Sequence, residues 1–286
     1  MRRGFTLTEM LVVVGIVAVL AAIIFPIYAR ARESANRAAC LTQVKGLGTA
    51  IGLYVADADD HAPMMRLGFF GGRVAMGLGW AGRVVPYARG TGGFACRSDK
   101  RGVRSGTALP GAQTVSYGIN SNLARETGIS SSVAASRTVL LFEVSGGRAL
   151  LSATDEGDSI RPGTYRLVSP TGDGTDGGLL AETSVWPGPG KDRFTLYATG
   201  EMDNAASRFD VDDTDDPRHG EGANFLALDG HAAWSKPEAV SAGHSAASAG
   251  DVQSPTGCPG FTDRGRLSPC AEGTAVGRHR FTFSAE

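Results

Sequence analysis

Residues 10–27 read MLVVVGIVAVLAAIIFPI, a run of eighteen residues without a charge. At about 1.5 Å per residue, a helix over residues 5–29 is long enough to cross the roughly 30 Å hydrocarbon core of a bilayer. Basic residues flank this run on both sides, at Arg2, Arg3, Arg30 and Arg32. The short basic N-terminal flank favours a cytoplasmic N-terminus with the rest of the chain exported. The sequence therefore predicts a single-pass membrane helix.

Three interpretations of this segment are open: a secretory signal peptide, a plain membrane anchor and a helix that takes part in assembly. Residues 29–31, Ala-Arg-Ala, resemble a signal-peptidase site. Glu9 needs an explanation, because an ionisable group in an apolar helix costs on the order of 2.5–3.5 kcal/mol at mid-bilayer. An amine on Phe5 would lie one helical turn from Glu9 on the same face. That amine exists only if the chain is cut between Gly4 and Phe5.

The stretch RRGFTLTE, residues 2–9, closely resembles the processing site of type IV prepilins and type II secretion pseudopilins. In that family a membrane aspartyl peptidase cuts after the glycine and methylates the new amino terminus. The resemblance implies that prepilin peptidase cleaves after Gly4 and that Phe5 becomes N-methylphenylalanine. It also implies that Glu9 pairs with the amino terminus of a neighbouring subunit. Pro26 cannot donate a backbone hydrogen bond, so we expect a kink that suits extraction from the bilayer.

A helical pattern continues past the apolar run. Small and apolar residues recur at spacings of three and four, at Ala31, Ala35, Ala38, Val44, Leu47, Ile51, Tyr54 and Val55. The pattern stops at residues 56–60, Ala-Asp-Ala-Asp-Asp. We expect one helix over residues 5–57, apolar all round in its first half and amphipathic in its second. Glycines at 46, 48 and 52 argue against a perfectly straight helix.

The rest of the chain alternates glycine-rich turns with short apolar runs. Residues 138–143 predict a buried strand, and residues 193–199 predict another strand. The apolar runs around Asp229-Gly230 predict a β-hairpin over 223–234. The expected fold class is α+β. It is a pilin-like lollipop, whose long N-terminal helix packs on an antiparallel β-sheet head with a loop-rich insertion.

A second resemblance lies in residues 218–231, RHGEGANFLALDGH. His219, Asp229 and Gly230 match the C-terminal signature of prepilin-like H-X9-DG proteins of the DUF1559 type. Cys40, Cys96 and the neighbourhoods of Trp80 and Tyr117 also fit that family, so the resemblance spans much of residues 1–237. We expect His219 to cap or hydrogen-bond the hairpin whose turn holds Asp229. His219, His231 and Asp229 could also be drawn as a metal or acid–base set, which we consider less favoured because zinc needs at least three converging ligands.

These patterns divide the chain into segments. They are a leader at 1–4, a transmembrane and assembly helix at 5–29, a stalk helix at 30–60, a globular head at 61–237 with an insertion at about 146–217, and a linker and tail at 238–286. Residues 241–257 are rich in Ala, Ser and Gly and are expected to be flexible. Residues 280–283 predict a short edge strand.

Aspartates cluster between residues 203 and 216. Clustered carboxylates in a loop suit Ca²⁺, which takes six to eight oxygen ligands. By analogy with major pseudopilins, Asp210, Asp212 and Asp215 are the candidate calcium ligands. The alternative is a solvated acidic loop, and no EF-hand spacing is present.

The chain has four cysteines, Cys40, Cys96, Cys258 and Cys270. In an oxidising compartment Cys258 and Cys270 could close a short loop, worth roughly 3 kcal/mol, and Cys40 and Cys96 could tie the stalk to the head. Four cysteines allow three connectivities, so the sequence leaves the pairing open.

The formal net charge is −1, which argues against nucleic-acid binding. We find no credible catalytic triad and expect a non-enzymatic subunit of a type IV pilus-like or secretion pseudopilus-like filament. Its expected partners are prepilin peptidase, other pilin subunits and the bacterial inner membrane, with the head outside the cytoplasm. The alternatives are a membrane-anchored extracytoplasmic binding protein that does not polymerise and, more weakly, an exported hydrolase that uses the insertion.

Overall fold

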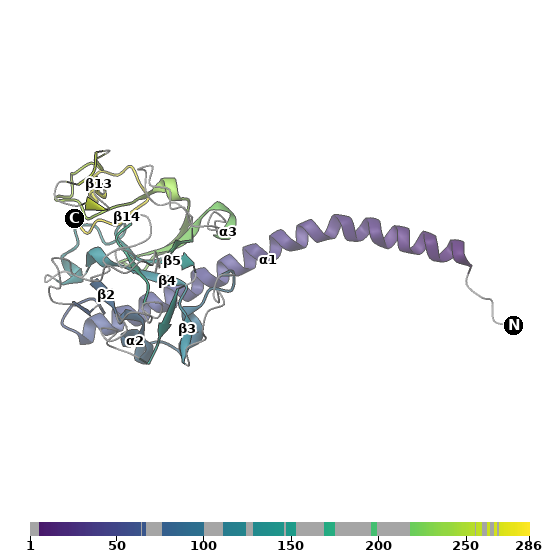
Figure 1. Ribbon diagram of the computed structural model, residues 1–286, viewed down its shortest axis with the longest axis horizontal. Helices are drawn as coiled ribbons and strands as arrows, with labels where there is room; N and C mark the ends of the chain where they lie inside the picture. Colours follow the sequence, from purple (N-terminus) through teal and green to yellow (C-terminus); the bar gives the residue numbers. More distant parts are fainter. Residues whose placement is uncertain are drawn as a thin grey trace.

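One long helix dominates the computed structural model. Helix α1 (Leu7–Asp57) is 51 residues long, or about 75 Å. Its first part projects away from a head that packs along one side of its last part (Figure 1). Helix α1 continues without a break through Pro26, and its projecting part curves gently. The structure describes residues 6–63, 65–66, 76–99, 111–123, 128–145, 147–152, 169–174, 196–198, 218–254, 256–258, 262–263, 266–267 and 269–286.

The elements of the head are short. Its strands are β1 (Met65–Arg66), β2 (Met76–Leu78), β3 (Ala112–Thr114), β4 (Tyr117–Asn120), β5 (Val139–Ser145), β6 (Arg148–Leu150), β7 (Thr171–Gly172), β8 (Leu196–Tyr197), β9 (Ala223–Ala227), β10 (Ala232–Ser235), β11 (Val240–Ser241), β12 (Thr262–Asp263), β13 (Arg266–Leu267) and β14 (Phe281–Thr282). Its helical segments are α2 (Trp80–Val84), η1 (Val85–Tyr87), η2 (Thr91–Phe94), η3 (Ser121–Leu123), η4 (Ile129–Ser131), α3 (Arg218–Glu221) and η8 (Pro237–Ala239).

The central sheet has the order β10-β9-β5-β4-β7, and β8 also pairs with β5. Its neighbours are antiparallel except for β4 and β7, which are parallel. The hairpin of β9 and β10 turns at Asp229-Gly230, where Gly230 has a φ of 87° that favours glycine. The remaining strands form the two-stranded pairs β1–β2, β3–β6, β11–β14 and β12–β13.

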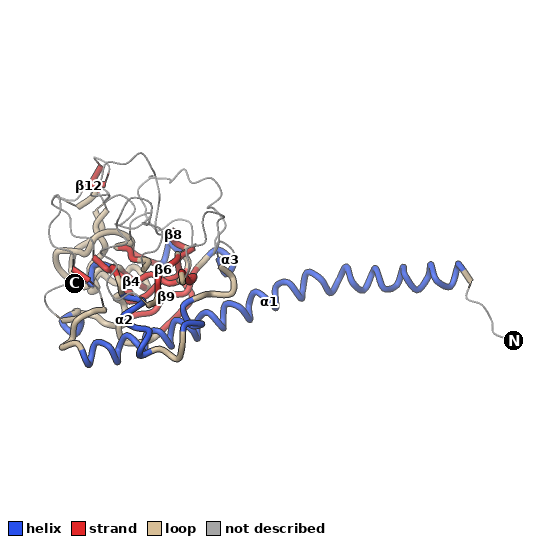
Figure 2. Tube along the Cα trace, turned by 60° about the horizontal axis from the view of Figure 1, so that its bottom comes forward, coloured by secondary structure: helices blue, strands red, loops and turns tan. Residues whose placement is uncertain are grey.

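The second half of α1 packs on this sheet. Its buried residues are Cys40, Val44, Leu47, Ala50 and Ile51. They share one apolar core with residues of α2, β4, β5 and β9. Gly48 lies where α1 meets β9, and a Cβ atom there would collide with the side chain of Leu226. The glycine therefore allows the close approach of helix and sheet. Figure 2 shows the strands gathered beside this last part of α1.

A second core joins the C-terminal residues to β5 and β9. Phe281 and Phe283 are fully buried and share a cluster with Phe142 and Phe225. Strand β11 pairs in parallel with β14. The strand expected at 280–283 is β14. The packing differs from the flexible linker expected after residue 238, because Val240, Ala242 and Ala246 are buried.

The α+β fold class is confirmed: a long N-terminal helix carries a separate β-sheet head. The buried strand expected at 138–143 is β5, and the hairpin expected over 223–234 is formed by β9 and β10. Strands β7 and β8 lie within the expected insertion and yet join the central sheet, so this region contributes to the core architecture. Other residues of the insertion lie outside the described part of the chain.

Candidate functional site

The first half of α1 is exposed along its whole length. Every residue from Thr6 to Arg32 is exposed. The apolar side chains include Leu11, Val14, Ile23, Ile24 and Phe25. The helix is long and apolar enough to cross a membrane. An apolar surface of this extent marks a site that contacts lipid or other proteins.

Glu9 lies at the first turn of this helix. The backbone N–H of Thr6 donates to Glu9 Oε2 at 2.8 Å, and the Glu9 N–H donates to Thr6 Oγ1 at 3.3 Å. This capping box satisfies two of the free N–H groups at the helix start. Gly4 and Phe5 lie outside the described residues, so the pairing of Glu9 with an amine stays a prediction.

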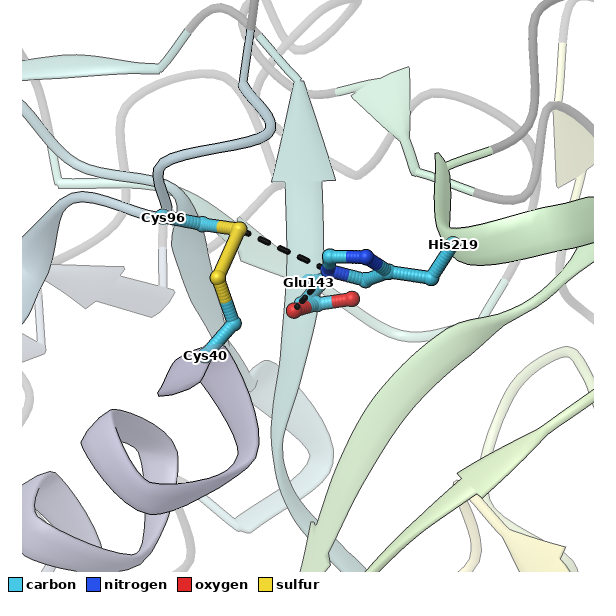
Figure 3. A group of neighbouring side chains, drawn as sticks. All are labelled: Cys40, Cys96, Glu143 and His219. Atoms are coloured by element: carbon cyan, nitrogen blue, oxygen red, sulfur yellow. Dashed lines mark hydrogen bonds and ion pairs between the residues drawn. A yellow bond between two sulfur atoms is a disulfide. The ribbon is translucent and has the colours of Figure 1, made fainter. Parts of the chain in front are cut away.

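A buried polar cluster lies where α1 enters the head. It is centred on His219 of α3, whose side chain is completely buried. His219 Nδ1 lies 2.7 Å from Glu33 Oε1 of α1, and Nε2 lies 3.2 Å from Glu143 Oε1 of β5. Figure 3 shows the ring beside Glu143 and the Cys40–Cys96 disulfide. The imidazole therefore joins the stalk helix to the central sheet.

The backbone at His219 is unusual. His219 has a φ of 57° and Gly220 a φ of 71°, both in the left-handed region. The carbonyl of His219 accepts a hydrogen bond from Trp234 Nε1 at 3.1 Å. Because Trp234 lies on β10, His219 contacts the hairpin through its backbone carbonyl and not through its ring. This tight turn leaves the ring free to reach α1 and β5.

Glu143 is the deepest acid in the cluster, with 1% of its surface exposed. Asn224 on the neighbouring strand β9 donates hydrogen bonds to both carboxylate oxygens of Glu143. The backbone N–H of Asn224 donates to Glu143 Oε2 at 2.8 Å, and Nδ2 of Asn224 donates to Glu143 Oε1 at 2.9 Å. A buried carboxylate is tolerated when it is paired and hydrogen-bonded, and Glu143 meets both conditions.

A second buried ion pair lies beside it. Arg218 Nη2 is 3.2 Å from Asp99 Oδ1, and the two side chains are 5% and 1% exposed. Ser116 Oγ donates to Asp99 Oδ2 at 2.7 Å, and Arg218 Nη2 donates to the carbonyl of Val144 at 2.7 Å. Arg218 and His219 are adjacent, so one turn supplies two cationic groups to the same junction.

The acids around His219 control its protonation. Burial opposes the charged ring, but the hydrogen bonds and charges of Glu143 and Glu33 outweigh burial and raise the pKa of His219. Partial burial also opposes the charged form of Glu33, yet His219 and Ser98 lower the pKa of Glu33. Both ring nitrogens face carboxylate oxygens, so the geometry favours the imidazolium, which donates from both.

All four cysteines are paired in the structure. Cys40 is bonded to Cys96, and Cys258 is bonded to Cys270. The first bond ties α1 to the segment after η2, with the two Cα atoms 5.3 Å apart. Cys96 Sγ lies 3.5 Å from His219 Nε2, so this disulfide borders the polar cluster.

The other end of the H-X9-DG pattern lies apart from the His219 ring. Asp229 Oδ1 accepts hydrogen bonds from the backbone N–H of His231 at 2.9 Å and pairs with His231 Nδ1 at 2.8 Å. Asp229 therefore stabilises the hairpin turn, while His219 uses its ring elsewhere. The candidate calcium ligands Asp210, Asp212 and Asp215 lie outside the described residues.

Several residues of the cluster were not singled out from the sequence. Glu33 sits in the stalk among other charged residues, 186 positions from its partner His219. Glu143 carried a signal that sequence reasoning could have used, because it is a single charge in the otherwise uncharged run Val139–Ser145. Asn224, Asp99 and Arg218 carried no such signal.

An exposed apolar helix that carries a separate β-sheet head is typical of a membrane-anchored protein. Residues 1–25 match the family model described as the prokaryotic N-terminal methylation motif. The match supports a type IV prepilin-like protein, and it implies processing by a prepilin peptidase and methylation of the new N-terminus. No curated protein and no solved structure matches the chain.

Proposed function

We propose that this chain is a structural subunit of a type IV pilus-like or type II secretion pseudopilus-like filament. It is cleaved after Gly4, methylated at Phe5, held in the bacterial inner membrane with its head outside the cytoplasm, and assembled through the first half of α1. We further assign it to the H-X9-DG group on the pattern of His219, Asp229 and Gly230. The function is mechanical and non-enzymatic.

The exposed half of α1 is the observation that carries the proposal. Residues 6–32 are all exposed and leave an apolar helical surface uncovered. Lipid covers this surface while the chain is in the membrane, and the helices of neighbouring subunits cover it in a filament. In the membrane and in a helical bundle alike, Glu9 requires a partner, because burying it alone is costly.

Processing is tested by the intact mass and N-terminal peptide map of the chain purified from bacterial membranes. A mature chain that starts at N-methylated Phe5 supports the proposal. A terminus at Met1 or Arg2 leaves a plain anchor, and a terminus near Arg32 indicates a secreted head; either result contradicts the proposal.

Assembly is tested separately with Glu9→Ala. We expect this variant to insert into the membrane at wild-type levels and to be lost from sheared or pelleted filaments. Thr8→Ala is the matched control, because it is a neighbouring exposed residue without an ionisable group, and it should assemble normally. Equal incorporation of Glu9→Ala would count against the role of Glu9. A correctly processed wild-type chain that never enters filaments would favour the anchored binding protein instead.

A further inference from the structure

We propose that the Cys40–Cys96 disulfide occupies a latent zinc site. When the bond is reduced, the two thiolates, His219 Nε2 and a carboxylate oxygen of Glu143 bind one Zn²⁺ ion. The proposal concerns the junction of stalk and head and is independent of filament assembly.

The four ligand atoms already converge. The two sulfurs, a nitrogen of His219 and an oxygen of Glu143 all lie within 4.8 Å of one another, and all four residues are buried (Figure 3). In a tetrahedral zinc site the ligand distances of about 2.0–2.3 Å place neighbouring ligand atoms roughly 3.3–3.8 Å apart. Small rotations of the two cysteine side chains, once their bond is broken, reach that spacing. The four residues come from α1, the segment after η2, β5 and α3.

The side chains behind these ligands are arranged as in metal centres. A zinc-bound histidine commonly donates its second ring N–H to a carboxylate, which sets the orientation and tautomer of the ring. Glu33 Oε1 lies 2.7 Å from His219 Nδ1 and is suited to this role. Ser98 Oγ in turn donates to Glu33 Oε1 at 3.1 Å. Asn224 fixes Glu143 through its backbone and side-chain N–H groups.

In the oxidised chain, the proton on His219 Nε2 occupies the space between the ligands in which the zinc ion would bind. His219 Nε2 faces Glu143 Oε1 at 3.2 Å and Cys96 Sγ at 3.5 Å. A neutral ring that donates from Nδ1 to Glu33 would present a lone pair from Nε2 to the Glu143 carboxylate, so the proton on Nε2 is what makes this contact attractive. A zinc ion in the same position supplies more positive charge and accepts the lone pair.

Formation of the zinc site begins with chemical reduction of the disulfide. A water-soluble phosphine breaks the S–S bond and is oxidised to its oxide, with water supplying the oxygen and two protons, and two thiols result. Zinc then binds two thiolates and the neutral imidazole, releasing two thiol protons and the Nε2 proton of the imidazolium. Sulfur and nitrogen ligands in a tetrahedral set favour zinc over calcium or magnesium.

The experiment uses the full chain in detergent micelles, treated with the phosphine and then titrated with Co²⁺, a coloured substitute for zinc. We expect one Co²⁺ per chain, with thiolate-to-cobalt charge-transfer absorption and tetrahedral ligand-field bands, both removed by one equivalent of Zn²⁺. The unreduced chain should show neither signal. Zinc should also raise the melting temperature of the reduced chain.

Variants locate the site. The double substitution Cys40→Ser/Cys96→Ser should abolish the charge-transfer band, whereas Cys258→Ser/Cys270→Ser should retain it. Glu33→Gln should weaken binding by about 10–100-fold while keeping the thiolate bands. Glu221→Gln, which removes an exposed carboxylate paired with Lys236, should leave affinity unchanged.

Three results would overturn the proposal. They are a reduced chain that binds no Co²⁺, binding that persists in the Cys40→Ser/Cys96→Ser variant, and a reduced chain that unfolds and is not refolded by zinc. Wild-type protein alone decides the first and third, so the test does not depend on the folding of any variant.

Discussion

His219 connects three elements through one side chain. Its ring nitrogens contact carboxylates of α1 and β5, and its carbonyl accepts from Trp234 on β10. The charged ring of His219 compensates the negative charge of Glu143, which has 1% of its surface exposed. Removal of the ring therefore leaves a buried carboxylate without a cationic partner. We expect His219→Gln to lower the free energy of unfolding by on the order of 3 kcal/mol, measured by thermal or denaturant unfolding of the full chain in detergent.

The same contacts make the stability of the head depend on pH. The pKa of His219 is raised in the folded chain, so its contribution is fully present below its unfolded value of about 6.5 and is lost as pH rises through the folded pKa. The pKa of Glu33 is lowered, so its contribution is present above its unfolded value of about 4.3 and is lost as pH falls through the folded pKa. Melting temperatures across this range should be highest between the two unfolded values.

Substitution of His219 tests the alkaline side of this dependence of melting temperature on pH. His219→Gln should flatten the loss of stability on the alkaline side. His231→Gln is the control, because His231 is an exposed residue of the Asp229 turn, and the alkaline side of the profile should match the wild type. An alkaline limb that persists in His219→Gln would show that another group causes it.

The sequence singled out His219 and predicted its contact with the hairpin, which the backbone carbonyl of His219 makes with Trp234. The sequence did not predict that the ring contacts Glu33 and Glu143. Spacing along the chain could not predict this, because Glu33 is 186 residues away and the connection depends on the left-handed backbone at His219 and Gly220. Glu143 was the accessible clue, since an acid in a buried strand requires a partner.

At the scale of elements, helix–sheet packing depends on one glycine of α1. Gly48→Ala places a methyl group against the buried side chain of Leu226, and overpacking of this kind costs about 1–3 kcal/mol. Gly46→Ala is the matched control in the same helix, because no atom lies within 4 Å of its Cβ position. It should stabilise the helix by up to about 1 kcal/mol. Urea unfolding of both variants tests the difference, and equal stabilities would contradict the packing argument.

The two disulfides should differ in their effect on stability. Cys40 and Cys96 are 56 residues apart in sequence, whereas Cys258 and Cys270 are 12 residues apart. Loop-closure entropy assigns about 4 kcal/mol to the first bond and about 3 kcal/mol to the second. Paired Cys→Ser substitutions at 40 and 96 should therefore lower the melting temperature more than those at 258 and 270. The reverse order would indicate that the chain entropy of the unfolded state does not dominate.

Long, periodic elements were predictable and short ones were less so. The helix, β5 and the β9–β10 hairpin follow from apolar spacing and from Asp229-Gly230. The burial of Ala242 was missed, because a run of small residues is typical of a linker, and the aromatic residues that share its core, Phe281 and Phe283, lie near the end of the chain. The sequence left the cysteine pairing open, because the bond between Cys40 and Cys96 depends on the position of α1 against the head.

At the scale of the whole molecule, head and membrane helix are separable. No residue from Thr6 to Arg32 is buried, so a chain that starts at Ala31 retains both cores and both disulfides. We expect this truncated chain, exported to an oxidising compartment, to be monomeric without detergent and to melt within a few degrees of the full chain. Size-exclusion chromatography and circular dichroism check this. Aggregation or a large loss of stability would show that the first half of α1 supports the head.

The Cys40–Cys96 bond also determines how the molecule responds to tension. A pulling force that enters along α1 reaches Cys40 and passes through the disulfide to Cys96, bypassing the chain between them. The 56-residue separation corresponds to a contour length of about 200 Å at roughly 3.5 Å per residue, which cannot be drawn out while the bond is intact. The last turns of the helix and α2 are thus protected from mechanical unravelling. Under load the oxidised head should behave as a short, stiff link, and reduction should add that hidden length to its extension.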